Sequence, residues 1–219
     1  MVKAAFMDYT GTIVQEGGKE IQEAVMTMCR NSNLHDPKIL LKECWRVIKE
    51  LEDESYGDAY LSEDEIVDKA LQFFVENIQL EADLDELHKL IQGFWVNAPV
   101  FPDVKEFFAA CPLPVYVISN NGMQYVSRAM ELNHLSPAGI VCADMVHAYK
   151  PHRELFEKAL EVSGCGADEA IHVGDSYQSD GIGALSAGIR PVLIIRSGVN
   201  EHPEITAVKR LSEVLDLLH

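Results

Sequence analysis

The sequence predicts an α/β protein in which helices cover both faces of a parallel sheet, with an all-helical segment inserted after the first strand. Beyond residue 99, short apolar runs alternate with amphipathic segments, an order typical of a three-layer α/β/α sandwich. Polar residues follow three apolar runs, at Asp8, Ser119 and Asp175, which places reactive groups at the carboxyl edge of the sheet. Residues 17–96, in contrast, show helical periodicity.

The N-terminal half divides into one strand and a helical insert. Residues 3–8 form an apolar run of the kind that becomes a buried strand. The segment Ser62 to Glu65 is a capping-box sequence and predicts the start of a helix. Two further apolar faces recur at helical spacing: Ile21, Val25 and Met28, and Leu41, Trp45 and Ile48. We therefore expect a helical domain over 17–96 and a core formed by 1–16 and 97–219.

The remaining elements alternate along the second half of the chain. The expected helices cover 104–110, 123–132, 151–162, 180–187 and 211–218. The expected strands cover 114–118, 139–143, 170–173 and 191–195. Pro151 suits the first turn of its helix, because the NH groups of that turn have no partner within the helix.

Composition limits the kinds of partner. The 219 residues include 35 acidic and 18 basic side chains, which gives a formal charge of −17. Because nucleic-acid backbones and anionic membranes are bound by clustered Lys and Arg, we expect neither partner. No apolar stretch has the length of a membrane span, and the N-terminus does not resemble a signal peptide, so we expect a cytoplasmic protein. The sequence is compatible with a monomer or a homodimer. The five scattered cysteines indicate neither a disulfide framework nor a zinc site.

Four short segments carry side chains that suit phosphoryl transfer. They are Asp8-Tyr9-Thr10-Gly11-Thr12, Ser119-Asn120, Lys150-Pro151, and Gly174-Asp175-Ser176 running on to Asp180. The carboxylate of Asp8 can attack phosphorus and form an aspartyl phosphate. The Ser119 hydroxyl and the NH groups of a following helix suit phosphate oxygens, and Lys150 can offset their charge. Asp175 and Asp180 supply the oxygen ligands that Mg²⁺ prefers.

In this order, the four segments resemble the motifs of the haloacid dehalogenase (HAD) superfamily, mostly magnesium-dependent phosphohydrolases, over residues 4–195. The resemblance implies a Rossmann-like core, a helical cap that sets specificity, and Asp8 as the nucleophile. It also implies that Asp8, the backbone carbonyl of Thr10 and Asp175 bind Mg²⁺, with Asp180 binding directly or through water. The implied substrate is a small phosphorylated metabolite, held by Thr12, Ser119, Asn120 and Lys150.

Thr10 departs from the family pattern. Most phosphatases of the family have a second aspartate at this position, which protonates the leaving group and later activates water. General acid–base help of this kind contributes roughly 10²–10⁴-fold, and a threonine hydroxyl does not supply it at neutral pH. Three consequences remain open: hydrolysis confined to good leaving groups such as acyl phosphates, a long-lived aspartyl phosphate, or a cap lysine acting as a Schiff base, as in phosphonatases.

Two other functions fit the same residues. A 2-haloacid dehalogenase also forms an aspartate ester and lacks the second aspartate, although Asp175 and Asp180 weigh against it. The non-enzymatic alternative is a protein that binds a phosphate ligand without turnover. Within the insert, an arc of basic residues is either an anion-attracting stripe or, more simply, a solvated helix face: Lys38, Lys42, Arg46 and Lys49. Histidines near the third and fourth segments show no metal-binding spacing and are expected to be structural or peripheral: His147, His152 and His172.

Overall fold

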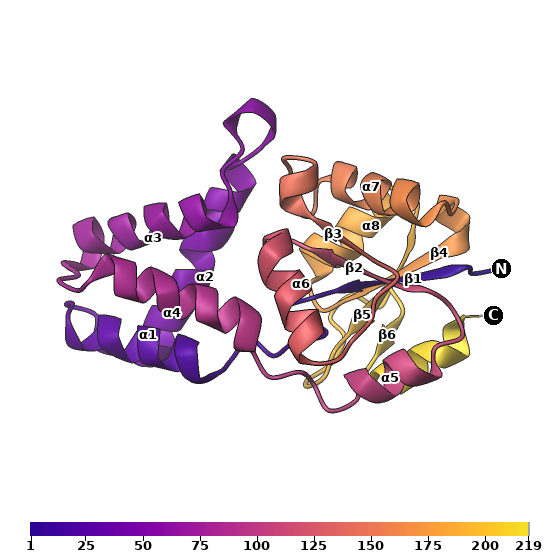
Figure 1. The fold of residues 1–219 in the computed structure, drawn as a ribbon, viewed down its shortest axis with the longest axis horizontal. Helices are drawn as coiled ribbons and strands as arrows, with labels where there is room; N and C mark the ends of the chain where they lie inside the picture. The colour runs from indigo at the N-terminus through magenta and orange to yellow at the C-terminus, as the bar shows by residue number, and fades with distance from the viewer. Residues whose placement is uncertain (219) are drawn as a thin grey trace. The chain divides into compact units, whose positions relative to one another are not determined.

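The structure is a computed structural model that describes residues 1–218, and it contains a six-stranded parallel sheet (Figure 1). The sheet has the order β3-β2-β1-β4-β5-β6. Its strands are β1 (Ala4–Asp8), β2 (Val115–Ser119), β3 (Gly139–Cys142), β4 (Ala170–Gly174), β5 (Arg190–Ile194) and β6 (Ala207–Val208). Every neighbouring pair is parallel, so the predicted α/β sandwich is confirmed.

The strand order brings the predicted motifs together. Strand β1 lies between β2 and β4, and Asp8 pairs in register with Ile118, while Met7 pairs with Val173. The ends of these three strands therefore lie next to one another at one edge of the sheet. All of β1 and β4 is buried, because helices cover both faces of a parallel sheet.

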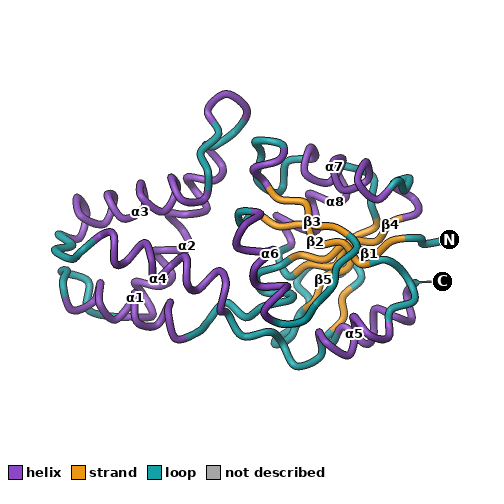
Figure 2. The backbone as a smooth tube through the Cα atoms, viewed as in Figure 1, coloured by secondary structure: helices purple, strands orange, loops and turns teal. Residues whose placement is uncertain are grey.

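Four helices and a C-terminal segment flank the sheet (Figure 2). They are α5 (Val104–Ala110), α6 (Met123–Leu132), α7 (Arg153–Ser163), α8 (Gly183–Ser186) and the 3₁₀ segment η5 (Leu211–Leu217). On one face, Phe156 of α7 and Ala184 of α8 belong to the same buried cluster as Phe6 and Ile118 of the sheet. Helix α5 contacts η5, and Figure 1 shows α5 on the opposite face.

Residues 17–99 form a compact unit of their own, and 1–16 with 100–219 form the other. We call them the helical unit and the α/β unit. The helical unit ends three residues beyond the expected boundary at 96, since its last helix runs to Asn97. Its helices are α1 (Lys19–Arg30), α2 (Pro37–Glu54), α3 (Glu63–Ile78) and α4 (Leu84–Asn97), with a 3₁₀ turn η1 (Gly57–Ala59). The role of this unit as a cap remains a prediction.

Local sequence signals explain most of the helical unit. The capping box is confirmed, since the Ser62 hydroxyl accepts from the Glu65 amide and the Glu65 carboxylate accepts from the Ser62 amide at 2.8 Å. The expected apolar face of α1 is buried. On α2, however, Leu40 and Val47 are the buried residues, because this helix packs against both α1 and α3. The face predicted for α2 is half-buried and lines an apolar cavity of about 30 Å³ with residues of α1 and α4.

Several expected elements differ in detail from the structure. The helix expected over 180–187 is a π-helical turn, η4 (Tyr177–Ile182), followed by the short α8. Helix α7 begins at Arg153 rather than at Pro151, and the segment expected as a helix over 211–218 is the 3₁₀ segment η5. Strand β6 was not expected, because its two residues carry no readable alternation. Across residues 1–218, no helix has both the length and the apolar character needed to cross a membrane.

Candidate active site

Asp8 ends β1 with one carboxylate oxygen engaged and the other free. The side chain is buried, and its Oδ1 accepts a hydrogen bond from Lys150 Nζ. Its Oδ2 is also buried, and among the residues that the structure describes it has no hydrogen-bond partner. Burial raises the pKa of Asp8 to about 6, although the charge of Lys150 opposes this rise. A buried carboxylate oxygen without a hydrogen-bond partner is available to bind a cation or to attack an electrophile.

Lys150 links Asp8 to Asp180. The ammonium is 3% exposed, and Nζ lies 2.7 Å from Asp180 Oδ1 while it also bonds Asp8. The backbone amide of Lys150 donates to Asn120 Oδ1 at 2.8 Å, which holds the segment against the end of β2. Burial alone would lower the pKa of Lys150, but the charges of Asp180 and Asp8 outweigh it and raise that pKa above its usual value. Lys150 is therefore a permanent cation between two carboxylates.

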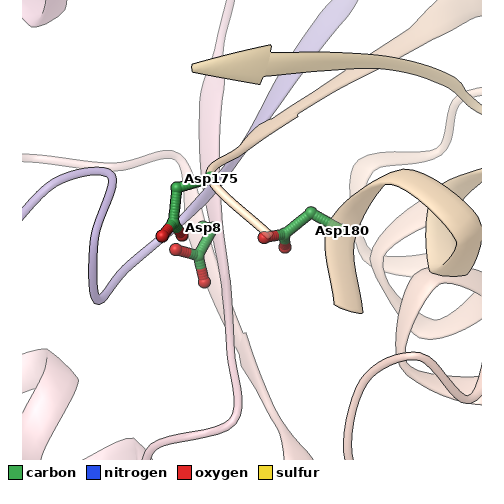
Figure 3. Close-up of side chains that lie close together, drawn as sticks. All are labelled: Asp8, Asp175 and Asp180. Atoms are coloured by element: carbon green, nitrogen blue, oxygen red, sulfur yellow. The ribbon is translucent and has the colours of Figure 1, made fainter. Parts of the chain in front are cut away.

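Three carboxylates meet at this edge of the sheet (Figure 3). Asp8, Asp175 and Asp180 each offer one oxygen, and these oxygens all lie within 4.8 Å of one another. Asp8 and Asp180 are buried, whereas Asp175 is exposed, so the cluster is open to solvent on its Asp175 side. Partial desolvation, together with repulsion from Asp8 and Asp180, raises the pKa of Asp175 to about 8. A cation bound among these oxygens would relieve that repulsion.

Two glycines make the close approach of the carboxylates possible. A Cβ atom on Gly11, whose φ is +88°, would lie 2.4 Å from Asp175 Oδ2. A Cβ atom on Gly174 would lie 2.1 Å from Asp180 Cγ. Non-bonded heavy atoms do not approach this closely, so both carboxylates occupy space that any other residue would fill.

Thr10, Ser119 and Asn121 form a hydrogen-bonded group beside the nucleophile. Asn121 Oδ1 accepts from Thr10 Oγ1 at 2.9 Å and from Ser119 Oγ at 3.1 Å. The backbone amide of Asn121 donates to Ser119 Oγ at 3.0 Å. Asn121 was not predicted, although it stands next to the predicted Asn120. Thr12 is fully buried, and its Oγ1 has no partner within the described part of the chain. The hydroxyl of Thr10 is thus held by an amide in the position where family phosphatases carry an acid.

His172 contacts the site although the sequence indicated a structural or peripheral role. The ring is fully buried in the middle of β4, with Nε2 2.9 Å from Asp180 Oδ1 and its edge against Phe156. Burial lowers the pKa of His172, and Asp180 offsets this only in part. The neutral ring therefore donates Nε2–H to Asp180 and fixes that carboxylate. A polar residue in the otherwise apolar run 170–174 was the available signal.

Asp180 uses both oxygens inside the protein. Oδ1 accepts from Lys150 and His172, and Oδ2 accepts from the Ser176 amide at 3.1 Å. Burial by itself would raise the pKa of Asp180, but Lys150 and the His172 hydrogen bond lower it well below its usual value. Asp180 is thus an anion whose oxygens are both hydrogen-bonded within the protein. Asp8 Oδ2 and the Asp175 carboxylate, in contrast, can still bind a cation or a substrate.

The donor set fits a hard divalent cation. Mg²⁺ takes oxygen ligands and keeps several waters, and this site combines anionic oxygens with access to solvent through Asp175. The carboxylates of Asp8 and Asp175 are suited to coordinate such a cation directly. The full engagement of Asp180 favours contact through water for that residue. The carbonyl of Thr10 remains a predicted ligand.

Two of the four residues in the basic arc of α2 pair with acids on the same helix. Arg46 pairs with Glu43 at 2.8 Å and with Glu50 at 2.6 Å, and Lys49 pairs with Asp53. Throughout 17–99, which the structure describes in full, every lysine is exposed or half-buried. A Schiff-base lysine is activated by desolvation or by another cation, so these positions favour a solvated helix face.

Comparisons with known proteins agree with the motifs. A family model described as a haloacid dehalogenase-like hydrolase matches residues 2–188. The phospholysine phosphohistidine inorganic pyrophosphate phosphatase of Mus musculus is 38% identical over 76 residues, which are 32% of this chain and 28% of that protein. The glyceraldehyde 3-phosphate phosphatase of Methanothermobacter thermautotrophicus is 28% identical over 87 residues, 36% of this chain and 38% of that protein. The matches thus span less than two fifths of either relative.

Among solved structures, the L-2-haloacid dehalogenase of Xanthobacter autotrophicus matches the whole chain. It has a TM-score of 0.82 and 17% identity, and the match covers 100% of this chain and 98% of that one. At this identity the likeness establishes the fold that the two proteins share.

Proposed function

Because the chain belongs to the haloacid dehalogenase-like hydrolases, we propose that it transfers the phosphoryl group of a small phosphorylated metabolite to Asp8 and then to water. In the first step, Asp8 Oδ2 forms a bond to phosphorus, and the bond to the leaving group breaks with its electron pair. In the second step, water attacks phosphorus and releases Asp8 as a carboxylate. Lys150 holds Asp8 ionised, and Ser119 and Asn120 contact the phosphoryl oxygens.

One observation carries this proposal: Asp8 Oδ2 is buried and has no hydrogen-bond partner within residues 1–218, and it lies beside a lysine and two further aspartates. The oxygen is free to react, and the adjacent Lys150 favours its ionised form. Mg²⁺ would neutralise the charge of the phosphoryl oxygens. Asp8 and Asp175 would bind it directly, and Asp180 would contact it through water.

Thr10 suggests the class of substrate. Its hydroxyl is bonded to Asn121 and offers no proton of suitable acidity to a departing alkoxide. Substrates whose leaving group departs without strong acid help are therefore the best candidates, such as acyl phosphates. The name of the mouse relative agrees with this, since phospholysine, phosphohistidine and pyrophosphate are not alkyl phosphomonoesters, whereas the archaeal relative is named for glyceraldehyde 3-phosphate, which is one. We expect weak activity on ordinary sugar phosphates.

Dehalogenation is the competing reaction. A dehalogenase would also use Asp8, but it has no evident use for the Asp175 carboxylate, which has an oxygen within 4.8 Å of oxygens of Asp8 and Asp180. Turnover of 2-chloropropionate in the presence of EDTA would favour dehalogenation over the phosphoryl reaction.

The direct test is intact-protein mass spectrometry after incubation with acetyl phosphate, with and without Mg²⁺. We expect the mass of one phosphoryl group on the wild-type protein with Mg²⁺, and none on Asp8→Asn, because the amide is not a nucleophile. If the wild-type protein neither gains the adduct nor releases phosphate, phosphoryl transfer through Asp8 is wrong.

A matched pair of variants tests the role of Thr10. Thr10→Asp restores the family acid, so hydrolysis of glucose 6-phosphate should rise by about 100-fold, the lower end of the range for general acid–base catalysis. Thr10→Asn has nearly the same size and shape as Thr10→Asp but carries no acid, so it should leave the rate at the wild-type level. An equal rise in both variants would attribute the gain to shape rather than to proton transfer.

A further inference from the structure

Arg196 makes an unusually complete set of contacts two residues after β5. Its Nη1 lies 3.0 and 3.1 Å from the two carboxylate oxygens of Asp103, and its Nη2 donates to the Thr12 carbonyl at 2.8 Å. The guanidinium carbon lies 3.7 Å from the centre of the Phe101 ring. The side chains of Arg196 and Asp103 are only 20% and 18% exposed. Two separate nitrogens that bind different partners, together with a guanidinium stacked on an aromatic ring, use the geometry that distinguishes Arg from Lys.

These contacts join two segments of the α/β unit. The nucleophile loop, residues 9–14, follows Asp8 directly, and the re-entry segment, residues 100–103, is where the chain returns from the helical unit. Backbone bonds already pair them, since the Phe101 amide donates to the Ile13 carbonyl at 3.0 Å. Residues Val14 and Val100 also form an antiparallel bridge. Arg196 binds both sides of this pairing with one side chain.

We propose that Arg196 is a positioning residue that locks the nucleophile loop to the re-entry segment, and so fixes Gly11 against Asp175 and Thr10 against Asn121. Thr12, whose carbonyl it binds, is adjacent to Gly11, the residue in contact with Asp175. A shift of this loop moves Gly11 toward or away from Asp175 and displaces Thr10 from Asn121. The loop itself is tight, with the Ile13 and Val14 amides both donating to the Tyr9 carbonyl.

The structure distinguishes this arrangement from an ordinary surface ion pair. Arg196 is mostly buried, and within the described residues its Nε has no hydrogen-bond partner, so its orientation is set by Asp103, Phe101 and the Thr12 carbonyl. Asp103 Oδ2 also accepts from the Leu211 amide at 2.9 Å, which anchors the carboxylate to the C-terminal part of the unit. Arg153 provides the contrast, because it pairs with Glu157 at 2.6 Å but is 59% exposed.

Amide hydrogen exchange of the metal-free protein tests the lock independently of any reaction. In Arg196→Met and Arg196→Lys, the amides of Ile13, Val14 and Phe101 should exchange about tenfold or more faster, as expected when a local opening becomes easier. The amides of β4 should be unchanged, and Arg153→Met should behave as wild type throughout. Wild-type exchange at 9–14 and 100–103 in either folded Arg196 variant would overturn the proposal. Arg196→Lys decides the matter if Arg196→Met does not fold.

The consequence for catalysis rests on the proposed function and has its own measurement. The rate of phosphate adduct formation from acetyl phosphate should fall by about 10–100-fold in Arg196→Lys, with a much smaller change in the half-saturating concentration, because misplacement affects reaction more than binding. Faster exchange with no adduct even in wild type would support the lock and overturn the phosphoryl reaction. An adduct formed at the wild-type rate, with wild-type exchange, would overturn the lock alone.

Discussion

The α/β unit and the helical unit handle charge in opposite ways. In the α/β unit, Lys150, Asp8 and Asp180 are almost completely removed from water and bonded to one another. In the helical unit, Arg46 pairs with Glu50, and these two side chains are 43% and 60% exposed. Buried ion pairs repay their desolvation poorly, and exposed pairs contribute little either way. We infer from this difference that the buried charges of the α/β unit serve the proposed chemistry, while the exposed charges of the helical unit mainly keep its surface hydrated.

Removing one lysine from each unit should give the largest contrast. Lys150→Met leaves Asp8 and Asp180 buried without their cation, so the free energy of unfolding should fall by about 3–5 kcal/mol. Lys49→Met removes the partner of Asp53 on the surface of α2 and should change that free energy by less than about 1 kcal/mol. Urea denaturation, with hydrogen exchange used to follow each unit separately, measures the free energy of unfolding in both variants. Similar losses in the two variants would contradict the contrast.

Mg²⁺ should stabilise the α/β unit selectively. A ligand that binds only the folded state raises the free energy of unfolding by about 2.7 kcal/mol when its concentration is about 100 times its dissociation constant. Here the cation would also relieve the repulsion among three carboxylates. Hydrogen exchange with and without Mg²⁺ should show slower opening in the α/β unit and no change in α1 to α4. Asp175→Asn should lose the effect, whereas Asp168→Asn, an exposed acid before β4, should keep it. Equal stabilisation of wild type and Asp175→Asn would place the cation elsewhere.

A smaller, pH-dependent effect belongs to the helical unit. His88 Nδ1 lies 2.6 Å from Asp68 Oδ1, and Nε2 lies 2.9 Å from Asp64 Oδ1, so the protonated ring joins α3 and α4. Burial alone would lower the pKa of His88, but the two carboxylates outweigh it and raise that pKa above 6.5. The resulting stability is fully present below pH 6.5 and is lost as the pH rises through the raised pKa.

Tryptophan fluorescence can measure this effect, because Trp45 and Trp95 are the two tryptophans of the chain and both lie in the helical unit. Between pH 6 and pH 8, the wild-type free energy of unfolding should fall by about 0.5–1 kcal/mol relative to His88→Gln, the size expected for a partly exposed pair. A difference between the two proteins that does not vary with pH would contradict the assigned role.

Local patterns in the sequence predicted the elements that local forces determine. The run ending in Asp8 became β1, and the four motif segments came together because parallel strands share one carboxyl edge. The capping box at Ser62 needed only residues three apart. Helices over 104–110 and 123–132 matched their periodic apolar faces.

The missed features depend on contacts between distant residues or on side chains that replace backbone bonds. Arg196 meets partners 93 and 184 residues away, and no local pattern marks such a residue. The π-helical turn at 177–182 forms where the Asp180 carboxylate accepts from the Ser176 amide and Ser176 Oγ accepts from the Ser179 amide. Helix propensity does not predict a turn in which side chains, rather than backbone carbonyls, accept from these two backbone amides.

Gly174 has a consequence for the interpretation of genetic variants. Exchanging glycine for alanine adds one methyl group and removes no reacting atom here. Yet that methyl carbon would fall 2.1 Å from Asp180 Cγ, so the carboxylate that holds Lys150 would have to leave its place. An inactive allele could therefore arise at a position without any side chain, and a survey of polar residues alone would overlook it.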